Sequence, residues 1–341
     1  MSEKQHADSA TAVRRLVEGF QVSQALHVAA TLGIADLLVG GDRTCDELAA
    51  TTRTHSPTLY RLLRALASVD VLRELDGRRF ELTSLGECLR SDVPNSVHGW
   101  AAFIGRPYFW QAWAALEHSV RTGENAFQHV HGTDVWSYRA ARPEESAVFD
   151  RAMTSLSRRS NAAILAAYDF GRFRTIVDVG GGNGALLAGV LAAHPKLEGT
   201  VFDLPHVAEH APALLAQANV ASRCRVVGGS FFKSVPEGAD AYILRAVIHD
   251  WSDEDSIQIL SVVRHAIGAN GVLLLVERVI ALPNEGRDVK FSDLNMLVGP
   301  GGRERSREEY AAIFEASGFR LGAVVPAGAH SLFEAAPANG R

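Results

Sequence analysis

The feature that most restricts the fold is an alternation of short apolar runs and helix-length segments that begins at residue 174. This alternation predicts an α/β fold, in which helices cover both faces of a doubly wound, mostly parallel sheet. The last such stretch, residues 320–337, has the pattern of two strands joined by a turn and predicts an antiparallel edge. Strands are expected at 174–179, 199–205, 224–232, 239–248 and 271–280, and helices at 185–194, 206–219 and 253–268.

A glycine-rich turn, DVGGGNGA at residues 178–185, follows the first expected strand directly. Glycines such as Gly180 and Gly182 can adopt positive φ and let a ligand approach the backbone closely. Asp203 lies at the end of the second expected strand, where this fold places an acid that hydrogen-bonds a ribose hydroxyl. Together these residues predict an adenosine-containing cofactor, although NAD-dependent dehydrogenases share the glycine pattern.

Asp178 helps to distinguish between two such cofactors. A dinucleotide would place its pyrophosphate at the start of the following helix, where a neighbouring carboxylate would repel it. S-adenosylmethionine (SAM) has no phosphate and carries an ammonium and a sulfonium, which a carboxylate attracts. The pattern therefore favours SAM, and an NAD-dependent dehydrogenase stays a remote alternative.

The first 95 residues have the pattern of a winged helix, in which three helices precede a hairpin. Helices are expected over 21–38, from Cys45 onward, and over 58–72 after a Ser56-Pro57 start. Residues 72–83 then predict a hairpin that turns at Asp-Gly. A winged helix can bind DNA, but nearby acids balance its arginines and the net charge of the chain is −5. A structural or dimerising role is therefore favoured. The arginines in question are Arg61, Arg64, Arg78 and Arg79.

Four motifs occur in the order and spacing of one known family. They are VDVGGGNG at 177–184, FDLP at 202–205, GGSFFKSVPEGADAYILRAVIHDWSDED at 228–255 and GPGGRERSREEY at 299–310. On these motifs the sequence resembles the class I SAM-dependent O-methyltransferases over residues 20–335. The most similar group is the two-domain family of plant caffeate-type enzymes and bacterial enzymes that methylate polyketide and other natural-product hydroxyls.

The resemblance implies a domain organisation, a partner and a reaction. It implies a winged-helix-like dimerisation domain at 1–95, a helical linker at 96–165 that contributes to the substrate pocket, and a Rossmann-like catalytic domain at 166–341. The expected protein is a homodimer that uses SAM without a metal and methylates a hydroxyl, typically phenolic, of an aromatic natural product. Further cofactor contacts implied by the resemblance are Gly180, Leu204, Ser230, Phe231, Arg245 and Ser157.

The sequence departs from the family pattern at two of these positions. Ser230 and Arg245 stand where many relatives carry aspartate and lysine. A serine can still accept a hydrogen bond from the adenine amino group, but a weaker one. The resemblance places Arg245 near the adenine and Ser157 at the methionine carboxylate, with which Arg158 could also pair.

His249 ends an apolar strand, and the topology explains why. In a doubly wound sheet, ligands bind at the carboxyl edge where the strand order reverses, and this reversal sets residue 249 beside the glycine turn. A phenol with a pKa of about 10 is scarcely ionised at neutral pH, whereas a histidine with a pKa near 6.5 can accept its proton. His249 is therefore the candidate general base, although alignment of the reactants could also suffice.

Three carboxylates are expected around this histidine by resemblance. Glu277 and Glu304 would orient the imidazole, and Asp250 would position a substrate hydroxyl. The acidic run at 253–255 is interpreted as a helix start capped by Ser252, not as a metal site.

Aromatic residues concentrate at 97–139, which holds four of the five tryptophans. Trp110 and Phe103 are candidates for an apolar wall against an aromatic substrate, although ordinary packing explains them equally well. Asn295 and Met296, in SDLNMLVG, are the other substrate candidates. The substrate itself and the hydroxyl that is methylated do not follow from these residues.

Two further functions stay open. A DNA-binding regulator that senses SAM would use the same two domains, and a few relatives support SAM-dependent decarboxylation or hydroxylation. Three scattered cysteines, no apolar signal core and no apolar run of about 20 residues predict a cytoplasmic protein with no membrane or nucleic-acid partner.

Overall fold

The computed structural model of the protein describes residues 3–338. Contacts divide the chain into two compact units. The first unit comprises Met1–Gln111 and Arg139–Leu156, and the second comprises Ala112–Tyr138 and Ser157–Arg341. The expected linker at 96–165 contributes to both units, and the three-part division stays a prediction.

The first unit is mainly helical and contains the hairpin that the sequence predicts. Strands pair in the order β1-β3-β2, and Phe80 of β3 is fully buried in the core of this unit. Its elements are α1 (Glu3–Val17), α2 (Gly19–Thr31), α3 (Ile34–Leu37), β1 (Arg43–Thr44), α4 (Cys45–Thr52), α5 (Ser56–Ala67), β2 (Leu72–Leu75), β3 (Arg79–Leu82), the 3₁₀ turn η1 (Gly86–Leu89) and α6 (His98–Ile104).

Two helices of this unit are shorter than their apolar periodicity predicts. The helix expected over 21–38 is divided into α2 and α3, because Gly33 adopts a left-handed φ of 66°. The helix expected to reach residue 72 ends at Ala67, and Asp70 follows with a φ of 59°. The periodicity continues through both breaks and therefore could not locate them.

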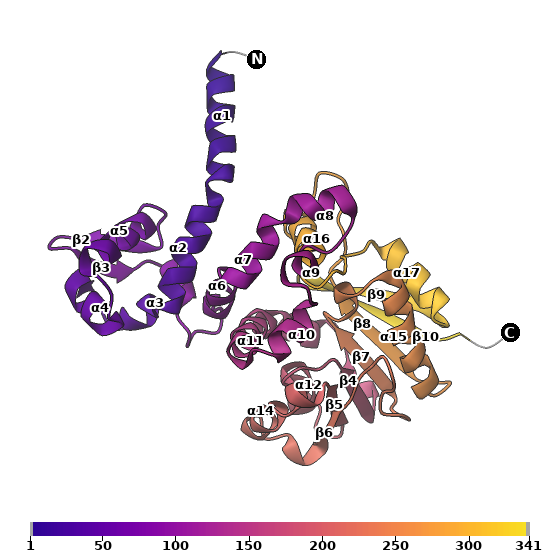
Figure 1. Ribbon diagram of the computed structural model, residues 1–341. Coiled ribbons are helices and arrows are strands. Elements are labelled where there is room, and N and C mark those ends of the chain that lie inside the picture. Colours follow the sequence, from indigo (N-terminus) through magenta and orange to yellow (C-terminus); the bar gives the residue numbers. More distant parts are fainter. Residues whose placement is uncertain (1–2, 339–341) are drawn as a thin grey trace. The chain divides into compact units, whose positions relative to one another are not determined.

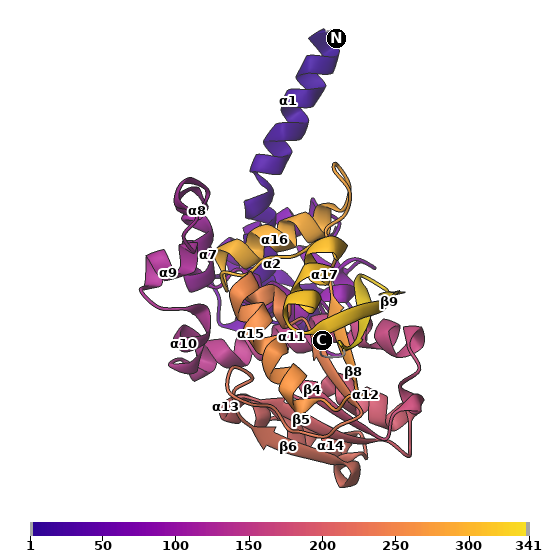
Figure 2. The same ribbon diagram turned by 90° about the vertical axis from the view of Figure 1, so that its right-hand side faces the viewer.

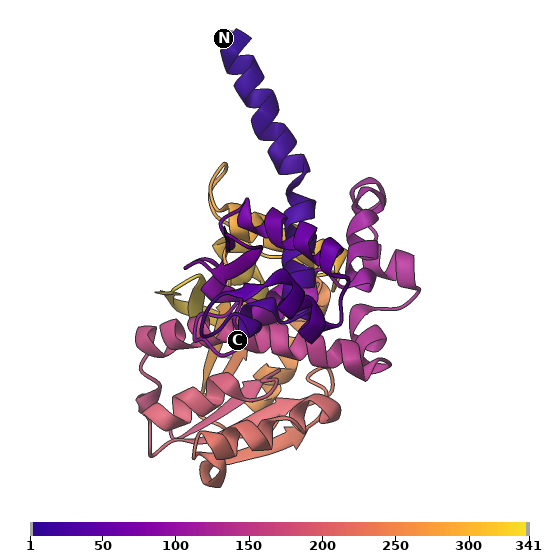
Figure 3. The same cartoon turned by 90° about the vertical axis from the view of Figure 1, so that its left-hand side faces the viewer.

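α1 lies outside the core of its own unit. Figure 3 shows α1 extending from α2 and away from the other helices of the first unit. All side chains at positions 8–17 are exposed, including Leu16 and Val17.

The arginines of the winged-helix region are partly used inside this unit. Arg79 forms an ion pair with Asp42. Arg64 and Arg78 both lie over the ring of Tyr60. These contacts support the structural role over DNA binding. Within residues 3–338 no helix has the length and apolarity needed to span a membrane.

A set of helices connects the winged-helix region to the sheet. These are α7 (Pro107–Ala114), α8 (Leu116–Thr122), α9 (Ala126–His131), α10 (Val135–Ala140) and the long α11 (Pro143–Ala167). α7, α10 and α11 each have residues in both units.

The second unit is built on the predicted doubly wound sheet, whose seven strands follow the order β6-β5-β4-β7-β8-β10-β9. The strand order reverses between β4 and β7, and β10 runs antiparallel to both of its neighbours. The strands are β4 (Thr175–Val179), β5 (Glu198–Asp203), β6 (Cys224–Gly228), β7 (Ala241–Arg245), β8 (Val272–Glu277), β9 (Phe319–Ala327) and β10 (His330–Pro337). The helices are η2 (Phe170–Arg172), α12 (Ala185–Ala193), α13 (Pro205–Ala208), α14 (Ala211–Gln217), η3 (Ala221–Arg223), η4 (Ile248–Asp250), α15 (Asp253–Ala266), α16 (Arg287–Val298) and α17 (Arg307–Ala316).

Alternate residues of each central strand enter two separate cores. Val177 and Leu244 belong to the core that contains α15 and α17, whereas Ile176 and Ile243 belong to the core that contains α12 and α14. Figures 1 and 2 show these two helical layers on opposite faces of the sheet. The continuous apolar character of the strands follows from burial on both faces.

Asn125 joins two helices of the second unit. Its side-chain oxygen accepts a hydrogen bond from the Gln128 backbone and caps the start of α9. Its side-chain nitrogen lies 2.8 Å from the Leu297 carbonyl and 3.1 Å from the Gly299 carbonyl, at the end of α16. One amide therefore satisfies backbone groups at the ends of both helices.

We expect Asn125→Ala to lower the free energy of unfolding by about 1–3 kcal/mol, because it removes a helix cap and a partly buried donor. Denaturant titration of the purified protein measures this loss. Asn270→Ala, at an exposed turn position of the same unit, is the matched control and should change stability little. Equal losses in the two variants would show that the cap is not important.

Candidate active site

His249 lies in η4, immediately beyond the carboxyl end of β7, as the topology predicts. Its side chain is only 15% exposed. Nδ1 lies 3.1 Å from Oε2 of Glu277 and 3.7 Å from Oε1 of Glu304, and Nε2 lies 3.5 Å from Oδ1 of Asp250. The structure thus brings together the histidine and all three carboxylates that the sequence analysis associated with it.

Glu277 supports the turn as well as the imidazole. Its side chain is fully buried at the end of β8, and Oε1 accepts hydrogen bonds from the backbone N–H groups of Val247 and Ile248. Ala246, just before these donors, has a φ of 53°, which is uncommon for a residue with a side chain. The buried carboxylate stabilises this unusual turn, which carries His249.

Glu304 reaches the histidine from the segment that precedes α17. Residue Arg305 forms a parallel bridge with Val279, and this bridge places the segment beside the end of β8. Oε1 of Glu304 accepts a hydrogen bond from Ser292 at 2.7 Å, and its backbone N–H donates to Asp293 at 2.9 Å. Glu304 is therefore a buried, oriented carboxylate and not a solvated surface charge.

Arg305 is a functional candidate that the sequence analysis missed. Its guanidinium is fully buried and donates to the carbonyls of Ile248 at 3.0 Å and Trp251 at 2.8 Å, on either side of His249. It also pairs with Asp253 at 2.8 Å. Arg305 thus stabilises the turn at residues 246–251, here called the histidine turn, through the carbonyl groups of that turn. The polar residues next to Arg305 in the sequence do not predict its burial.

Charges around His249 determine its protonation. Burial of the imidazole would lower its pKa, but the charges of Glu277 and Asp250 and the contacts with Glu277 and Glu304 outweigh this effect. The pKa of His249 therefore lies well above its usual value. For Glu304, burial raises the pKa, yet the contact and charge of His249 and the Ser292 hydrogen bond bring it below the usual value. The ligand-free site thus favours an imidazolium between carboxylates.

The glycine turn lies beside the histidine turn. A side chain at Gly180, which has a φ of 71°, would lie 2.7 Å from Cγ2 of Val247. The backbone N–H of Gly182 donates to Asp203 at 2.8 Å, and that carboxylate also accepts from the Leu204 N–H at 2.7 Å. Asp203 therefore shapes the turn whether or not it also contacts a ribose.

Asp178 is buried at the end of β4, and its Oδ2 has no hydrogen-bond partner among the described residues. Burial, with the charge of Asp203 adding to it and that of Arg245 opposing it, raises the pKa of Asp178 to about 7. A buried carboxylate with one unpartnered oxygen favours binding of a cation at this position.

Arg245 contacts Ser157 and Ser160, with guanidinium distances of 2.7 and 2.6 Å to their hydroxyls. Its Nε is buried and unpartnered within the described chain, and burial lowers its pKa. Arg245 and Ser157 therefore lie together, and the part of a cofactor that each contacts stays a prediction. The remaining expected contacts, Leu204, Ser230 and Phe231, lie at or just beyond the ends of β5 and β6, and Phe231 stacks edge-on against Trp251.

The expected substrate residues have different surroundings. Asn295 of α16 accepts a hydrogen bond from Trp113 Nε1 at 3.3 Å, and the next residue, Met296, is nearly buried. Phe103 and Trp110 belong to the first unit. Phe103 is only 2% exposed and packs against Phe109 and Phe149, which favours the packing interpretation of this residue.

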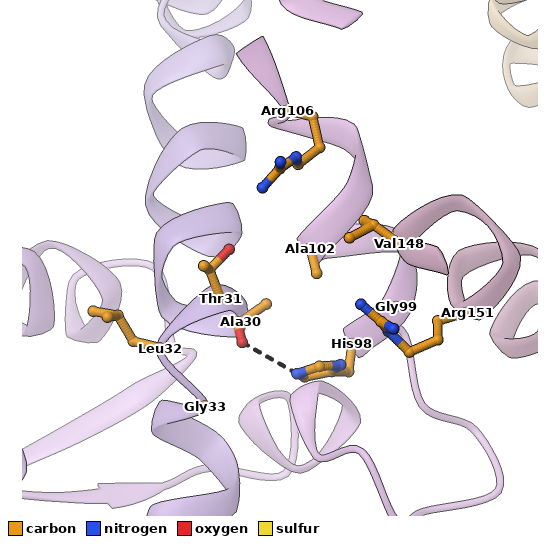
Figure 4. A pocket seen from close by; sticks show the side chains of 10 residues that line it. All are labelled: Ala30, Thr31, Leu32, Gly33, His98, Gly99, Ala102, Arg106, Val148 and Arg151. Carbon is orange, nitrogen blue, oxygen red and sulfur yellow. Dashed lines mark hydrogen bonds between the residues drawn. The ribbon is translucent and has the colours of Figure 1, made fainter. Parts of the chain in front are cut away.

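A cavity of about 320 Å³ lies in the first unit (Figure 4), and it is lined by none of these candidate residues. His98 donates toward the Ala30 carbonyl, and Arg106 forms an ion pair with Glu145. These two polar side chains of the lining are therefore already partnered.

Ser252 caps α15 as predicted, because its hydroxyl accepts from the Asp255 N–H. His249, Glu277 and Glu304 each place one atom within 4.8 Å of the others, which is close enough for an ion. However, Glu277 and Glu304 already bind backbone N–H groups and Ser292, respectively. A protonated His249 accounts for the close approach of Glu277 and Glu304 to one imidazole without a metal ion. The absence of a metal stays a prediction.

Comparison with known proteins decides the family. A model of the O-methyltransferase domain matches residues 113–320, and a model of the O-methyltransferase dimerisation domain matches residues 14–92. The chain belongs to the O-methyltransferase family. It is therefore a SAM-dependent O-methyltransferase, and its resemblance to that family is confirmed.

Individual relatives of this methyltransferase cover nearly all of the chain. Phenazine O-methyltransferase PhzM of Lysobacter antibioticus is 42% identical over 95% of this chain and 95% of its own length. The solved structure of the mitomycin 7-O-methyltransferase MmcR covers 99% of this chain and 100% of its own, with a TM-score of 0.93 and 38% identity. The O-methyltransferase NcsB1 from neocarzinostatin biosynthesis, solved with SAM and 2-hydroxy-5-methyl naphthoic acid, covers 93% and 96%, with a TM-score of 0.81 and 35% identity. Another relative, 36% identical over 90% of this chain and 84% of its own length, is named aclacinomycin 10-hydroxylase RdmB, from Streptomyces purpurascens.

The methyltransferase fits its cofactor at three places. Asp178 offers a buried, unpartnered oxygen to a cation, Arg245 offers a buried, unpartnered donor to an anion, and the turn at Gly182 leaves open space beside the backbone. An amino acid carries both charges, so this set suits the methionine part of SAM.

We expect Arg305→Lys to lower the free energy of unfolding by roughly 3 kcal/mol and to reduce kcat, because a compact ammonium lacks the planar fork of donors with which Arg305 reaches Asp253, Ile248 and Trp251. Denaturant titration and steady-state kinetics measure the two effects. Arg303→Lys, at a neighbouring side chain that is 46% exposed, should change stability by less than about 1 kcal/mol. Similar losses in both variants would show that the buried network does not hold the histidine turn.

Proposed function

We propose that this enzyme methylates a hydroxyl of an aromatic substrate, with His249 as the general base. The observation that carries the proposal is the placement of His249. It lies two residues beyond Val247, which packs against the glycine turn at Gly180. Its Nδ1 faces the buried Glu277. Nε2 is the ring nitrogen on the opposite side from Glu277, beside Asp250.

The bound cofactor supplies a methyl group on a cationic sulfur. His249 accepts the proton of the substrate hydroxyl at Nε2, so that the oxygen can form its bond to the methyl carbon. Nδ1–H remains directed at Glu277, which fixes the tautomer and stabilises the imidazolium that forms. Asp250, within 3.5 Å of Nε2, is placed to position the hydroxyl or to hold it through a water molecule.

The raised pKa of His249 restricts this mechanism. An imidazolium cannot accept a proton, and in the ligand-free enzyme near pH 6.5 His249 is mostly protonated. It therefore cannot act as the base in that state. A cation beside the turn disfavours the imidazolium and lowers its pKa. The free base is therefore formed most readily when the cofactor is bound.

We assign the cofactor contacts by position and charge. Asp178 receives the ammonium group, and Arg245, supported by Ser157, receives the carboxylate. Asp203 binds the ribose, and Leu204, Ser230 and Phe231 contact the adenine. Gly180 and Gly182 admit the ligand to the backbone.

The substrate that we propose is a fused aromatic compound. The relative solved with a naphthoic acid and the phenazine methyltransferase both support this class. In this chain, Met296, Asn295 and Trp113 offer an apolar surface with one amide, and Trp110 stays a candidate from the first unit. The matched dimerisation domain supports a homodimer, and a cytoplasmic location stays a prediction.

We expect S-adenosylhomocysteine to bind about tenfold more tightly at pH 8 than at pH 6, because a larger fraction of Asp178, with its pKa of about 7, is then ionised. Isothermal titration measures this dependence, with NAD as a parallel ligand that should not bind. Asp178→Asn should weaken binding and remove the pH dependence. Asp288→Asn, at a 93% exposed side chain, should leave both unchanged. Absence of binding at millimolar concentration would contradict the assigned contacts.

We expect His249→Ala to lower kcat by about 10²–10⁴-fold with little change in the KM for SAM, because base catalysis is lost while the cofactor contacts remain. In the wild type, kcat/KM for the substrate should fall with decreasing pH through a limb above pH 6.5, in accordance with the raised pKa. Rates with a panel of phenols and naphthols measure both effects.

Two controls accompany this test. His265→Ala, at an exposed histidine of α15, should retain full activity, and a chelator should leave the rate unchanged. Mass analysis of the product distinguishes a gain of a methyl group from a gain of an oxygen atom, since one relative is named a hydroxylase. Full activity of His249→Ala would leave alignment alone as the source of catalysis.

A further inference from the structure

The charges of Glu277 and Glu304 act on the hydroxyl of a buried tyrosine, Tyr310. Within residues 3–338, Oε2 of Glu277, Oε2 of Glu304 and the hydroxyl of Tyr310 are buried and form no hydrogen bond, although Oε2 of Glu277 lies 3.1 Å from Nδ1 of His249. Tyr310 is fully buried, so bulk water does not satisfy its hydroxyl. Two unpartnered polar groups in one apolar core are costly unless they satisfy each other.

The fold places Tyr310 on the same side of the sheet as the carboxylates. Its ring lies 4.9 Å from the ring of Phe333 in β10, and Phe333 pairs with Leu275 of β8. Leu275 and Glu277 are two residues apart and therefore point to the same face of the strand. Tyr310 also belongs to α17, which begins just after Glu304 and is fixed there by the Ser306 capping box.

The electrostatics of the tyrosine agree with this position. Burial is the main reason that its pKa lies well above the usual value, and the charges of Glu277 and Glu304 raise it further. The hydroxyl therefore keeps its proton at any pH at which the enzyme operates. Against carboxylates it can act only as a donor.

We propose that the Tyr310 hydroxyl donates a hydrogen bond to the Glu304 carboxylate through one water molecule, and thereby controls how tightly the carboxylate pair retains the proton of His249. Tyr310 is then a positioning residue for the methyl transfer. The inference rests on the proposed function of His249 as the base.

The direction of the effect follows from the charges that face His249. Asp250 acts from its own turn, Glu277 from β8 and Glu304 from the segment before α17. His330 faces it from β10 but is uncharged, because burial and the nearby arginines lower its pKa to about 4. Arg278, just beyond β8, acts on Glu304.

A proton donated by Tyr310 withdraws negative charge from Glu304, so His249 releases its proton at a lower pH than it otherwise would.

The test is Tyr310→Phe, which removes one oxygen and keeps the ring. The acid limb of kcat/KM should move upward by about half to one pH unit, so that activity on the acid side falls about three- to tenfold. Activity at the alkaline plateau should stay within about twofold of the wild type. The ring signals of His249, followed by NMR with ¹³C-labelled histidine and assigned with His249→Gln, should shift their titration in the same direction.

Tyr242→Phe is the matched control. Tyr242 is also fully buried and belongs to the same face of the sheet, but its hydroxyl donates to the Pro236 carbonyl at 2.6 Å, away from the histidine. This variant should lower Tm and leave the acid limb where it is.

Other outcomes separate the two proposals. An acid limb that stays in place or moves downward in Tyr310→Phe, or an equal loss at every pH, would overturn the role of Tyr310. If His249→Ala is nevertheless inactive, His249 remains the base. If His249→Ala keeps full activity, the proposed function fails and the inference about Tyr310 fails with it.

Discussion

The buried carboxylate of Glu277 is the interaction on which the rest of the site depends. One of its oxygens accepts two backbone N–H groups of the histidine turn, and the other lies 3.1 Å from Nδ1 of His249. A buried carboxylate without such partners would cost several kcal/mol. The end of β8, the turn after β7 and the imidazole are therefore held in one arrangement by a single charge. Arg305 stabilises the same turn through its carbonyl groups, so the N–H and C=O sides of the turn are both satisfied.

Much of the fold could be predicted from the sequence because the relevant signals are local. Apolar runs of strand length alternate with helices, and this pattern alone indicates the doubly wound sheet. The place of His249 follows from the strand order, which brings the ends of β4 and β7 to one edge. For Glu277 and Glu304 the residues themselves gave no such signal, and only the resemblance to a family singled them out. In the structure, an oxygen of Glu277 lies 3.1 Å and an oxygen of Glu304 lies 3.7 Å from Nδ1 of His249.

What the sequence could not predict depends on packing between distant segments. Arg305 stands in an alternation of charged and polar residues that is typical of a solvated surface, yet it is buried against the turn that carries His249, about 50 residues earlier in the chain. Tyr310 has the spacing of an ordinary core residue in α17, and that spacing does not indicate that the charges of Glu277 and Glu304 act on its hydroxyl. The helix break at Gly33 was missed for a different reason, since apolar periodicity continues across a residue whose φ is positive.

The protonation state of His249 depends on the charges of its neighbours as well as on its residue type. From its residue type alone, a histidine is a free base near neutral pH, which suits proton abstraction. Buried carboxylates on two sides reverse this expectation and favour the imidazolium. In the mechanism that we propose, His249 gains one positive charge when it accepts the proton of the substrate hydroxyl, so the carboxylates would stabilise the state that follows proton transfer. A cation bound beside the glycine turn would make the preceding neutral state of His249 accessible.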